Sequence, residues 1–256
     1  MGSSPTEKHL WSLQLHAALV VAKKNVLIYY LKAPVLIFGV LFPVFFFLAF
    51  ATGRPVSVEE IAPGMLAMAL FFTASAVGPL VTPWERQAKT YERLISSPAS
   101  LEAILAGDVL AGLGFGAVFS AIPLALALAL TKTTVAAPVE LLVGLGLGAL
   151  TFASLGVLLS APATQSPSQI MMLANLVRLP LIFVSGVFVP IEKMPAWGRC
   201  LAASSPLSYC TDLVRRGFGY DGYFPLWLAP VALLGFTAIF LLVARRLHHL
   251  GRRKGQ

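Results

Sequence analysis

The amino-acid sequence predicts an all-α integral membrane protein with six transmembrane helices, and three observations support this fold class. Hydrophobic residues make up 57% of the 256 residues and charged residues only 12%, whereas about 25% of the residues in soluble domains are charged. Apolar stretches without Asp, Glu, Lys or Arg recur along the chain, and a helix needs about 20 such residues to cross a bilayer. Basic residues cluster between particular stretches. Together these features exclude a soluble globular fold.

The boundaries of the predicted spans follow from the uncharged stretches. The longest stretch, residues 141–177, is too long for one helix and contains the polar, turn-rich sequence SAPATQSPSQ, so we divide it there. The predicted spans are residues 33–53, 61–83, 103–131, 138–160, 169–190 and 224–246.

The distribution of Lys and Arg predicts the orientation of these spans. Basic residues concentrate before the first span, between the second and third, and after the sixth. Because cytoplasmic loops carry the excess of Lys and Arg, we expect both termini on the cytoplasmic side of the cytoplasmic membrane. The loop between the fourth and fifth spans has no charged residue, so its cytoplasmic position follows only from the number of spans that precede it.

Residues 6–32 precede the first span and have apolar residues at helical spacing. This pattern predicts an amphipathic helix in the cytoplasmic membrane interface, anchored by Trp11, Tyr29 and Tyr30. The alternative is a cytoplasmic extension of the first span. The formal net charge of +8 favours anionic lipid headgroups over nucleic acid as a partner, because the basic residues flank apolar spans rather than alternate with aromatics.

The segment WERQAKTYERLI, at residues 84–95, is unusually charged for this chain. It predicts a cytoplasmic helix of about three turns with a partly apolar side formed by Tyr91, Leu94 and Ile95. Pro98 ends this helix, and a second helix, capped by Ser97 or Ser100, runs directly into the third span. A push on the short helix would therefore reach a membrane span. The alternative is a solvated loop whose charges only enforce topology.

The segment after the fifth span, residues 195–220, is too polar to cross the membrane and is rich in aromatic residues. Pro195 and Pro206 are expected at helix starts, and an aromatic belt at the outer interface is expected from Trp197, Tyr209, Phe218, Tyr220 and Tyr223. The alternative is an interfacial loop without a role in transport. Cys200 and Cys210 could pair if the segment folds back at Pro206, but on one continuous helix they would stand about 15 Å apart; we favour free thiols.

Arg178 is the one basic residue in the interior of a predicted span, away from its ends, and Asn175 lies one turn before it. Charges inside membranes usually face a bundle interior or an aqueous cavity, so one hypothesis is that Arg178 attracts an anionic substrate or closes an inner gate. The alternative is that Arg178 extends to the cytoplasmic interface.

Motifs for chemistry in this chain are missing from the sequence. It contains no G-x-x-x-x-G-K-[ST] phosphate loop and no H-E-x-x-H zinc motif. The four histidines lie at residues 9, 16, 248 and 249, away from a plausible nucleophile. The sequence therefore predicts a protein that is not an enzyme, without a cofactor or metal of its own.

Two segments resemble a known family. The first is ERQAKTYERLISSPASLEAILAGDVL, with its E-R-L-x-x-S-P-x-S core, and the second is LPLIFVSGVFVPIEKMPAWGRCLAASSPLSYCTDLVRRGFGY. Both are similar to segments of ABC-2 type permeases, the membrane subunits of ATP-binding-cassette exporters, and within that family the drug-resistance and nodulation-type lipo-oligosaccharide exporters are most similar.

This resemblance implies a function. Residues 84–97 would be the coupling helix that docks on a separate ATPase subunit, with the contacts Glu85, Arg86, Lys89, Tyr91, Glu92 and Arg93. Residues 195–220 would form re-entrant helices at the outer exit. The chain would act as a homodimer with two ATPase copies that bind ATP and Mg²⁺, and would export a lipid-like, amphipathic or glycan-lipid substrate. A stand-alone secondary carrier or channel, or a membrane scaffold, are the alternatives.

Overall fold

The computed structural model describes residues 5–29, 37, 41, 44–45, 58–130, 134–162 and 166–253. Helices and their connections account for all of this part, in agreement with the predicted all-α class. The predicted first span, residues 33–53, lies almost entirely outside the described residues. The total of six spans therefore stays a prediction.

Ten helical elements occur in the described part, one of them a 3-10 turn. In chain order they are α1 (Pro5–Tyr29), α4 (Val58–Gln87), α5 (Thr90–Ile95), α6 (Leu101–Leu130), α7 (Pro138–Leu159), α8 (Pro167–Val184), η2 (Ile191–Lys193), α9 (Ala196–Ala203), α10 (Pro206–Gly217) and α11 (Leu228–Arg253).

Five of these helices are long and apolar enough to cross a membrane: α4, α6, α7, α8 and α11. They correspond to the second to sixth predicted spans, so the described chain is a multi-pass membrane protein. The ends differ from the prediction mainly at three helices. α11 begins at Leu228 and continues to Arg253, whereas the predicted span was 224–246. α4 continues to Gln87, past the predicted end at residue 83. α8 ends at Val184 rather than near residue 190, because Ser185 donates back to the Ile182 carbonyl at 2.8 Å and Gly186 has a φ of +79°, which terminates a helix.

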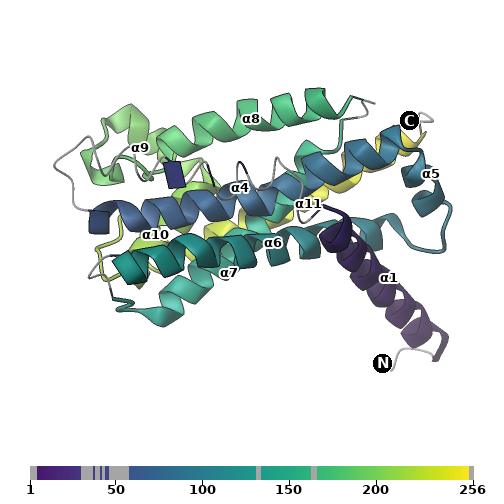
Figure 1. Cartoon of the computed structure of the whole chain (residues 1–256), viewed down its shortest axis with the longest axis horizontal. Helices are drawn as coiled ribbons and strands as arrows, with labels where there is room; N and C mark the ends of the chain where they lie inside the picture. Colours follow the sequence, from purple (N-terminus) through teal and green to yellow (C-terminus); the bar gives the residue numbers. More distant parts are fainter. Residues whose placement is uncertain are drawn as a thin grey trace.

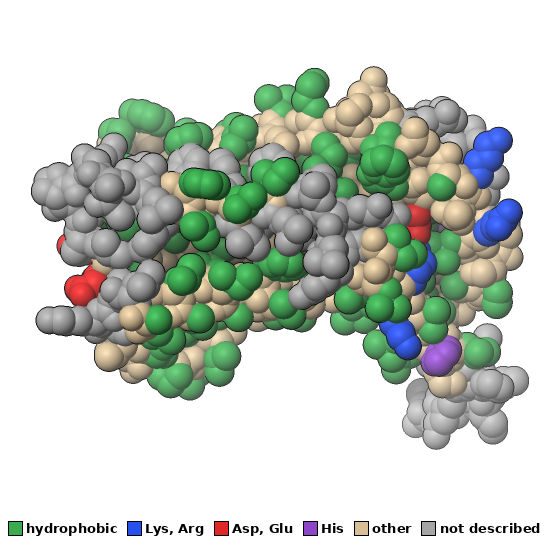
Figure 2. Space-filling view, viewed as in Figure 1, with side chains coloured by type: hydrophobic (Ala, Val, Ile, Leu, Met, Phe, Trp, Pro, Cys, Tyr) green, Lys and Arg blue, Asp and Glu red, His purple; other side chains and the backbone are tan. Residues whose placement is uncertain are grey.

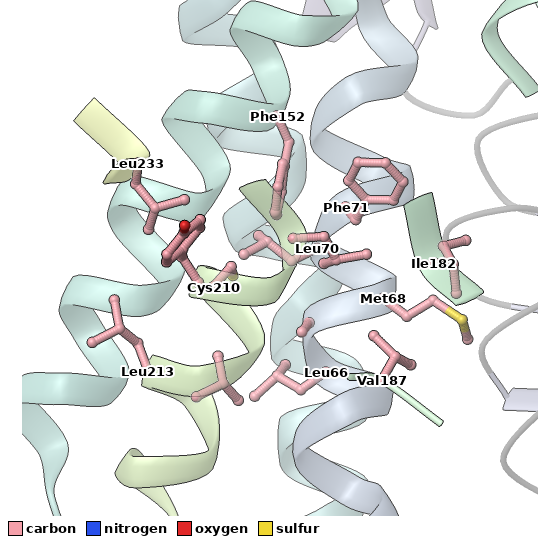
Figure 3. Packing of buried hydrophobic residues seen from close by; sticks show 14 of the residues in the cluster. Leu66, Met68, Leu70, Phe71, Phe152, Ile182, Val187, Cys210, Leu213 and Leu233 are labelled. Carbon is pink, nitrogen blue, oxygen red and sulfur yellow. The ribbon is translucent and has the colours of Figure 1, made fainter. Parts of the chain in front are cut away.

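α4 is the central helix of the bundle. Its apolar stretch is fully buried, with α6 and α7 packed along it and α8 on another side (Figure 1). Phe71 of α4 meets Phe152 of α7 edge to face at 4.9 Å between ring centroids. Figure 3 shows these rings together with Ile182 of α8 and Leu213 of α10 in one continuous apolar core.

Glycine allows α4 and α7 to approach closely. A Cβ on Gly156 of α7 would lie 2.6 Å from the carbonyl oxygen of Ser75 in α4, and a Cβ on Gly112 of α6 would lie 2.7 Å from the carbonyl oxygen of Ala74. In lipid, helix association depends on such close packing rather than on hydrophobic exclusion. The backbone of α4 is therefore held by its neighbours at van der Waals distance.

α1 leaves the bundle at an angle beside one end of α6 (Figure 1). It packs against α6 and, less extensively, α4. Ala18 and Val21 are buried in this contact, while Leu15, Leu19 and Leu27 are exposed. Apolar residues thus lie on both the packed and the exposed sides of α1. A position in the membrane interface stays a prediction for this helix.

Candidate functional site

Basic side chains gather at one end of the molecule. Figure 2 shows Lys and Arg mainly toward the end that holds α5 and the C-terminus in Figure 1. The segment of residues 84–97 lies at this end, beside the start of α6 and the end of α11. This is the place where the sequence predicts contact with a partner.

The predicted three-turn helix over residues 84–95 is divided in two. The first part is the last turn of α4, which ends at Gln87; a turn at Ala88 and Lys89 follows, and α5 begins at Thr90. Lys89 has a φ of +55°, the left-handed conformation that closes many helices. The Lys89 amide donates to the Arg86 carbonyl at 3.1 Å. The helical spacing that we expected between Lys89 and its neighbours is therefore interrupted.

Glu85 points into the protein. Its side chain is buried and forms an ion pair with Lys24 of α1. Thr90 at the start of α5 donates its hydroxyl to the Glu85 carbonyl at 3.2 Å. Glu85 thus connects α1, the end of α4 and the start of α5.

Arg86 also makes internal contacts. Its Nη1 donates to the Pro162 carbonyl at 2.7 Å, and its guanidinium lies over the Tyr91 ring at 5.2 Å from the centroid. Tyr91 is buried, and desolvation raises the pKa of its hydroxyl, with partial opposition from Arg86. The contact with Pro162 places the α7–α8 connection at the same end as residues 84–97, as parity predicted.

Lys89 and Arg93 have exposed side chains. Lys89 lies on the turn after α4, and Arg93 lies on α5. The side chain of Glu92 is outside the described residues. Of the six predicted contact residues, Glu85 and Tyr91 are thus buried, Arg86 is half-buried, and Lys89 and Arg93 face outward.

A second polar contact between α1 and the bundle was missed in the sequence. Asn25 donates its Nδ2 to Asp108 of α6 at 2.7 Å, and both side chains are buried. Lys24 and Asn25 interrupt an apolar stretch, and Asp108 interrupts another. These polar residues in apolar stretches could have indicated the contact, because buried polar side chains usually have a hydrogen-bond partner.

Arg178 of α8 is only 1% exposed and donates its Nη2 to the carbonyl oxygen of Ser75, near the middle of α4. Pro79 explains why this carbonyl accepts: proline has no N–H, so the Ser75 carbonyl lacks its usual donor four residues later. The structure thus excludes the alternative in which Arg178 extends to the interface. The Nε of Arg178 and the Oδ1 of Asn175 have no hydrogen-bond partner among the described residues.

The segment after α8 forms two short helices as predicted from its prolines. Pro195 immediately precedes α9, and Pro206 occupies the first turn of α10. Trp197 is 69% exposed. Tyr209 is buried instead: its hydroxyl donates to the Ala203 carbonyl at 2.8 Å and its ring lies 4.4 Å from that of Phe224. Tyr209, like the buried Phe218, belongs to the core and not to an aromatic belt.

α10 lies against α7, α4 and α11. Asp212 of α10 accepts the Tyr223 amide at 2.5 Å and pairs with Arg216 at 3.2 Å, and Arg216 donates to the Phe224 carbonyl at 2.6 Å. These contacts fold the connection to α11 back over α10. Both cysteines are free; Cys210 is buried and Cys200 is exposed.

The described residues offer little for bond chemistry or metal binding. Among them, no three or more His, Cys, Asp or Glu side chains are grouped so that they could hold a metal ion. The polar groups at the basic end instead make helix-to-helix contacts and present exposed cations. Such an arrangement can transmit movement and bind a partner.

Comparisons with known proteins agree with the fold. A family model described as ABC-2 type transporter matches residues 16–218. The daunorubicin resistance ABC transporter permease protein of Streptomyces coeruleorubidus is 31% identical over 38% of this chain and 33% of its own length. Nodulation protein J of Rhizobium leguminosarum bv. trifolii is 30% identical over 60% and 59%, respectively. The inner membrane transport permease YadH of Escherichia coli K12 is 26% identical over 76% of each chain.

The similarity to the first two relatives spans well under two thirds of their length. The family match, in contrast, extends from α1 to the residue after α10 and includes residues 84–97, Arg178 and the outer helices. Because this match covers well over half of the sequence, the chain belongs to the ABC-2 type transporter family.

Proposed function

We propose that this chain is the permease subunit of an ATP-binding-cassette exporter in the cytoplasmic membrane, with both termini cytoplasmic. It moves a lipid-like, amphipathic or glycan-lipid substrate out of the cytoplasm, using ATP hydrolysed by a separate ATPase subunit. Family membership supports the transport role, and the names of the relatives, a drug-resistance permease and a nodulation protein, favour amphipathic or glycan-bearing cargo. The main structural support for the proposed ATPase contact is the exposed cationic turn after α4.

The proposed docking surface is the outward side of residues 84–97. Lys89 and Arg93 present two cations there, and Trp84 and Gln87 are exposed on the last turns of α4. Tryptophan and arginine are both enriched at protein–protein interfaces. The buried Glu85 and Tyr91 and the half-buried Arg86 support this surface from behind.

Coupling follows from helix continuity. α4 stays helical from the core to Gln87, although Pro79 and Pro83 each remove one of its internal hydrogen bonds, so a displacement of the turn at Lys89 acts on the same helix that forms the core. Glu85 passes the same displacement to α1 through Lys24, and Arg86 passes it to the α7–α8 connection through Pro162. ATP binding that closes two ATPase subunits would thereby move several helices together.

The functional unit in this proposal is a homodimer with two ATPase copies, which hold ATP and Mg²⁺; this chain binds neither. Exposed apolar residues on α8, among them Met172, Leu176 and Phe183, offer surfaces for lipid and for the second copy. The short helices α9 and α10 would form the re-entrant outer segment that shapes the exit, with Trp197 at the outer interface.

Asn175 and Arg178 are proposed to line the substrate pathway. Their Oδ1 and Nε atoms have no hydrogen-bond partner within the described part of the chain. This supports the role, because buried polar groups without partners mark sites where another group is expected. The bond between Arg178 and Ser75 would have to open for substrate to reach them. Arg178→Ala and Arg178→Lys should both lose most transport at equal protein abundance, whereas transport that survives in both variants would discard the pathway role.

The test of the ATPase contact is co-purification from detergent with an ATPase assay. Lys89→Glu combined with Arg93→Glu should release the ATPase subunit and its activity, because both side chains are exposed and reversal replaces attraction with repulsion. Lys193→Glu is the matched control, since Lys193 is exposed on η2 at the other end of the molecule.

Retention of the ATPase by the double variant would contradict the assignment of residues 84–97. A protein that purifies alone and moves solute across liposomes without ATP would instead be a secondary carrier or channel.

A further inference from the structure

A groove lies between α1 and the first two turns of α6, and the proposed transport role does not use it. Gln14, Leu15 and Ala18 line it from α1, and Glu102, Ala103 and Ala106 line it from α6. Its volume is about 480 Å³, and its lining is mostly apolar. Ligand pockets in proteins commonly have volumes of this order.

Polar contacts fix the width of the groove at both ends. At one end the Gln14 side chain donates to the Pro98 carbonyl at 3.3 Å and accepts the Ser100 amide at 2.8 Å. Two to three turns further along α1, Lys24 and Asn25 are bound to α4 and α6. α1 is therefore held beside α6 at two points, with the apolar groove between them.

Charged side chains of α6 and α11 lie at the mouth of the groove. The Oε1 of Glu102 pairs with Arg245 at 3.0 Å and lies 3.5 Å from the Nε2 of His249, both on the last turns of α11. Arg246 follows Arg245 on the same turn of α11 and is also exposed. This turn of α11 therefore carries two arginines, one of which is paired with Glu102. On the α1 side, the exposed Leu15 and Leu19 continue the apolar lining outward.

We propose that this groove holds one acyl chain of an anionic phospholipid from the bilayer, with the lipid phosphate beside Arg245. The apolar lining suits a hydrocarbon chain and not a polar ligand. The two exposed arginines on this turn of α11 suit an anionic headgroup, since basic residues near a membrane surface attract anionic lipids. The bound lipid joins α1 to α6 and α11.

The first measurement is native mass spectrometry of the purified chain, titrated with phosphatidylglycerol or with phosphatidylcholine of the same acyl chains. We expect one tightly bound phosphatidylglycerol per chain. Ala106→Trp fills the groove from an exposed position and should weaken that binding by about tenfold or more, because the indole ring occupies the volume of the acyl chain, which then loses its van der Waals contacts with the groove lining. Ala125→Trp is the control, since Ala125 is exposed near the other end of α6 and its replacement should leave binding unchanged.

The second measurement addresses the headgroup. Arg245→Gln should weaken phosphatidylglycerol binding by about fivefold, the effect of one basic residue at a membrane surface, and leave phosphatidylcholine binding unchanged. Lys193→Gln, at the other end of the molecule, should change neither.

Three outcomes would overturn the proposal. The first is equal lipid binding by Ala106→Trp and Ala125→Trp, and the second is equal affinity of the unmodified protein for the two lipids. The third is an Ala106→Trp variant that binds lipid as before but loses the dimer or an ATPase subunit. The last outcome would assign the groove to a protein partner. These readouts need neither ATP nor transport, so failure of the exporter proposal would leave them interpretable.

Discussion

α10 and α5 are both short helices between membrane spans, but the protein holds them in different ways. α10 has twelve residues and is buried along most of its length against α7, α4 and α11. α5 has six residues, packs mainly against α4 and follows a turn with an exposed lysine. The helix at one end is part of the core, and the helix at the other end stands outside it.

The difference shows how each helix is specified. α10 depends on shape: Gly144 and Gly148 of α7 leave space for Leu213 and Cys210. α5 is held to the end of α4 by a few contacts: the Thr90 hydroxyl donates to the Glu85 carbonyl, and the Arg86 guanidinium lies over the Tyr91 ring. Close packing resists displacement, whereas a small number of partly exposed polar contacts allows it. We therefore expect the outer segment to keep its shape while the α5 end responds to a partner.

The largest effect is expected where α10 meets α7. A Cβ on Gly144 would lie 2.8 Å from the Cβ of Leu213, so Gly144→Val should lower the free energy of unfolding by about 3 kcal/mol through overpacking. Thermal unfolding in detergent measures this. Gly146→Val is the control, because a Cβ there meets nothing within 4 Å and the change in helix propensity is the same. Equal melting temperatures would remove the claim that α10 is held by shape.

An intermediate effect is expected at the ion pair between Lys24 and Glu85. A double-mutant cycle with alanine at each position should give a coupling free energy of about 2 kcal/mol. Both side chains are largely buried, so each single variant leaves the other residue's charge without its partner. The Glu102 and Arg245 pair is exposed on both sides and should give less than about 1 kcal/mol. Similar couplings for the two pairs would show that α1 is not anchored through Glu85.

The smallest effect is expected at the turn before α5. Lys89→Gly should raise the free energy of unfolding by about 0.5 kcal/mol. Glycine adopts the left-handed conformation without steric strain, which stabilises the folded state. Its greater conformational freedom in the unfolded chain offsets part of this stabilisation. Ala88→Gly, one residue earlier, should lower it by a similar amount. Chemical denaturation of both variants gives the comparison. A stability loss in Lys89→Gly would indicate that the lysine side chain contributes contacts of its own.

The sequence predicted the spans well and the interior contacts poorly. Apolar length located α4, α6, α7, α8 and α11, and proline positions located the starts of α9 and α10. The direction of each charged side chain could not be predicted in the same way. Glu85 and Lys89 share one short segment, yet one is buried against α1 and the other is exposed, because a single left-handed residue changes the direction of the chain.

The sequence alone determined that this is a helical membrane protein of a recognisable family, because apolar length and the order of Gly, Pro and aromatic residues are local properties. Only the tertiary structure decided what the buried polar residues contact. Arg178 reaches the Ser75 carbonyl that Pro79 leaves without a donor, and Asn25 reaches Asp108 across 83 positions of sequence. Such pairings depend on which helices lie side by side, and composition, charge and spacing along one chain do not specify that arrangement.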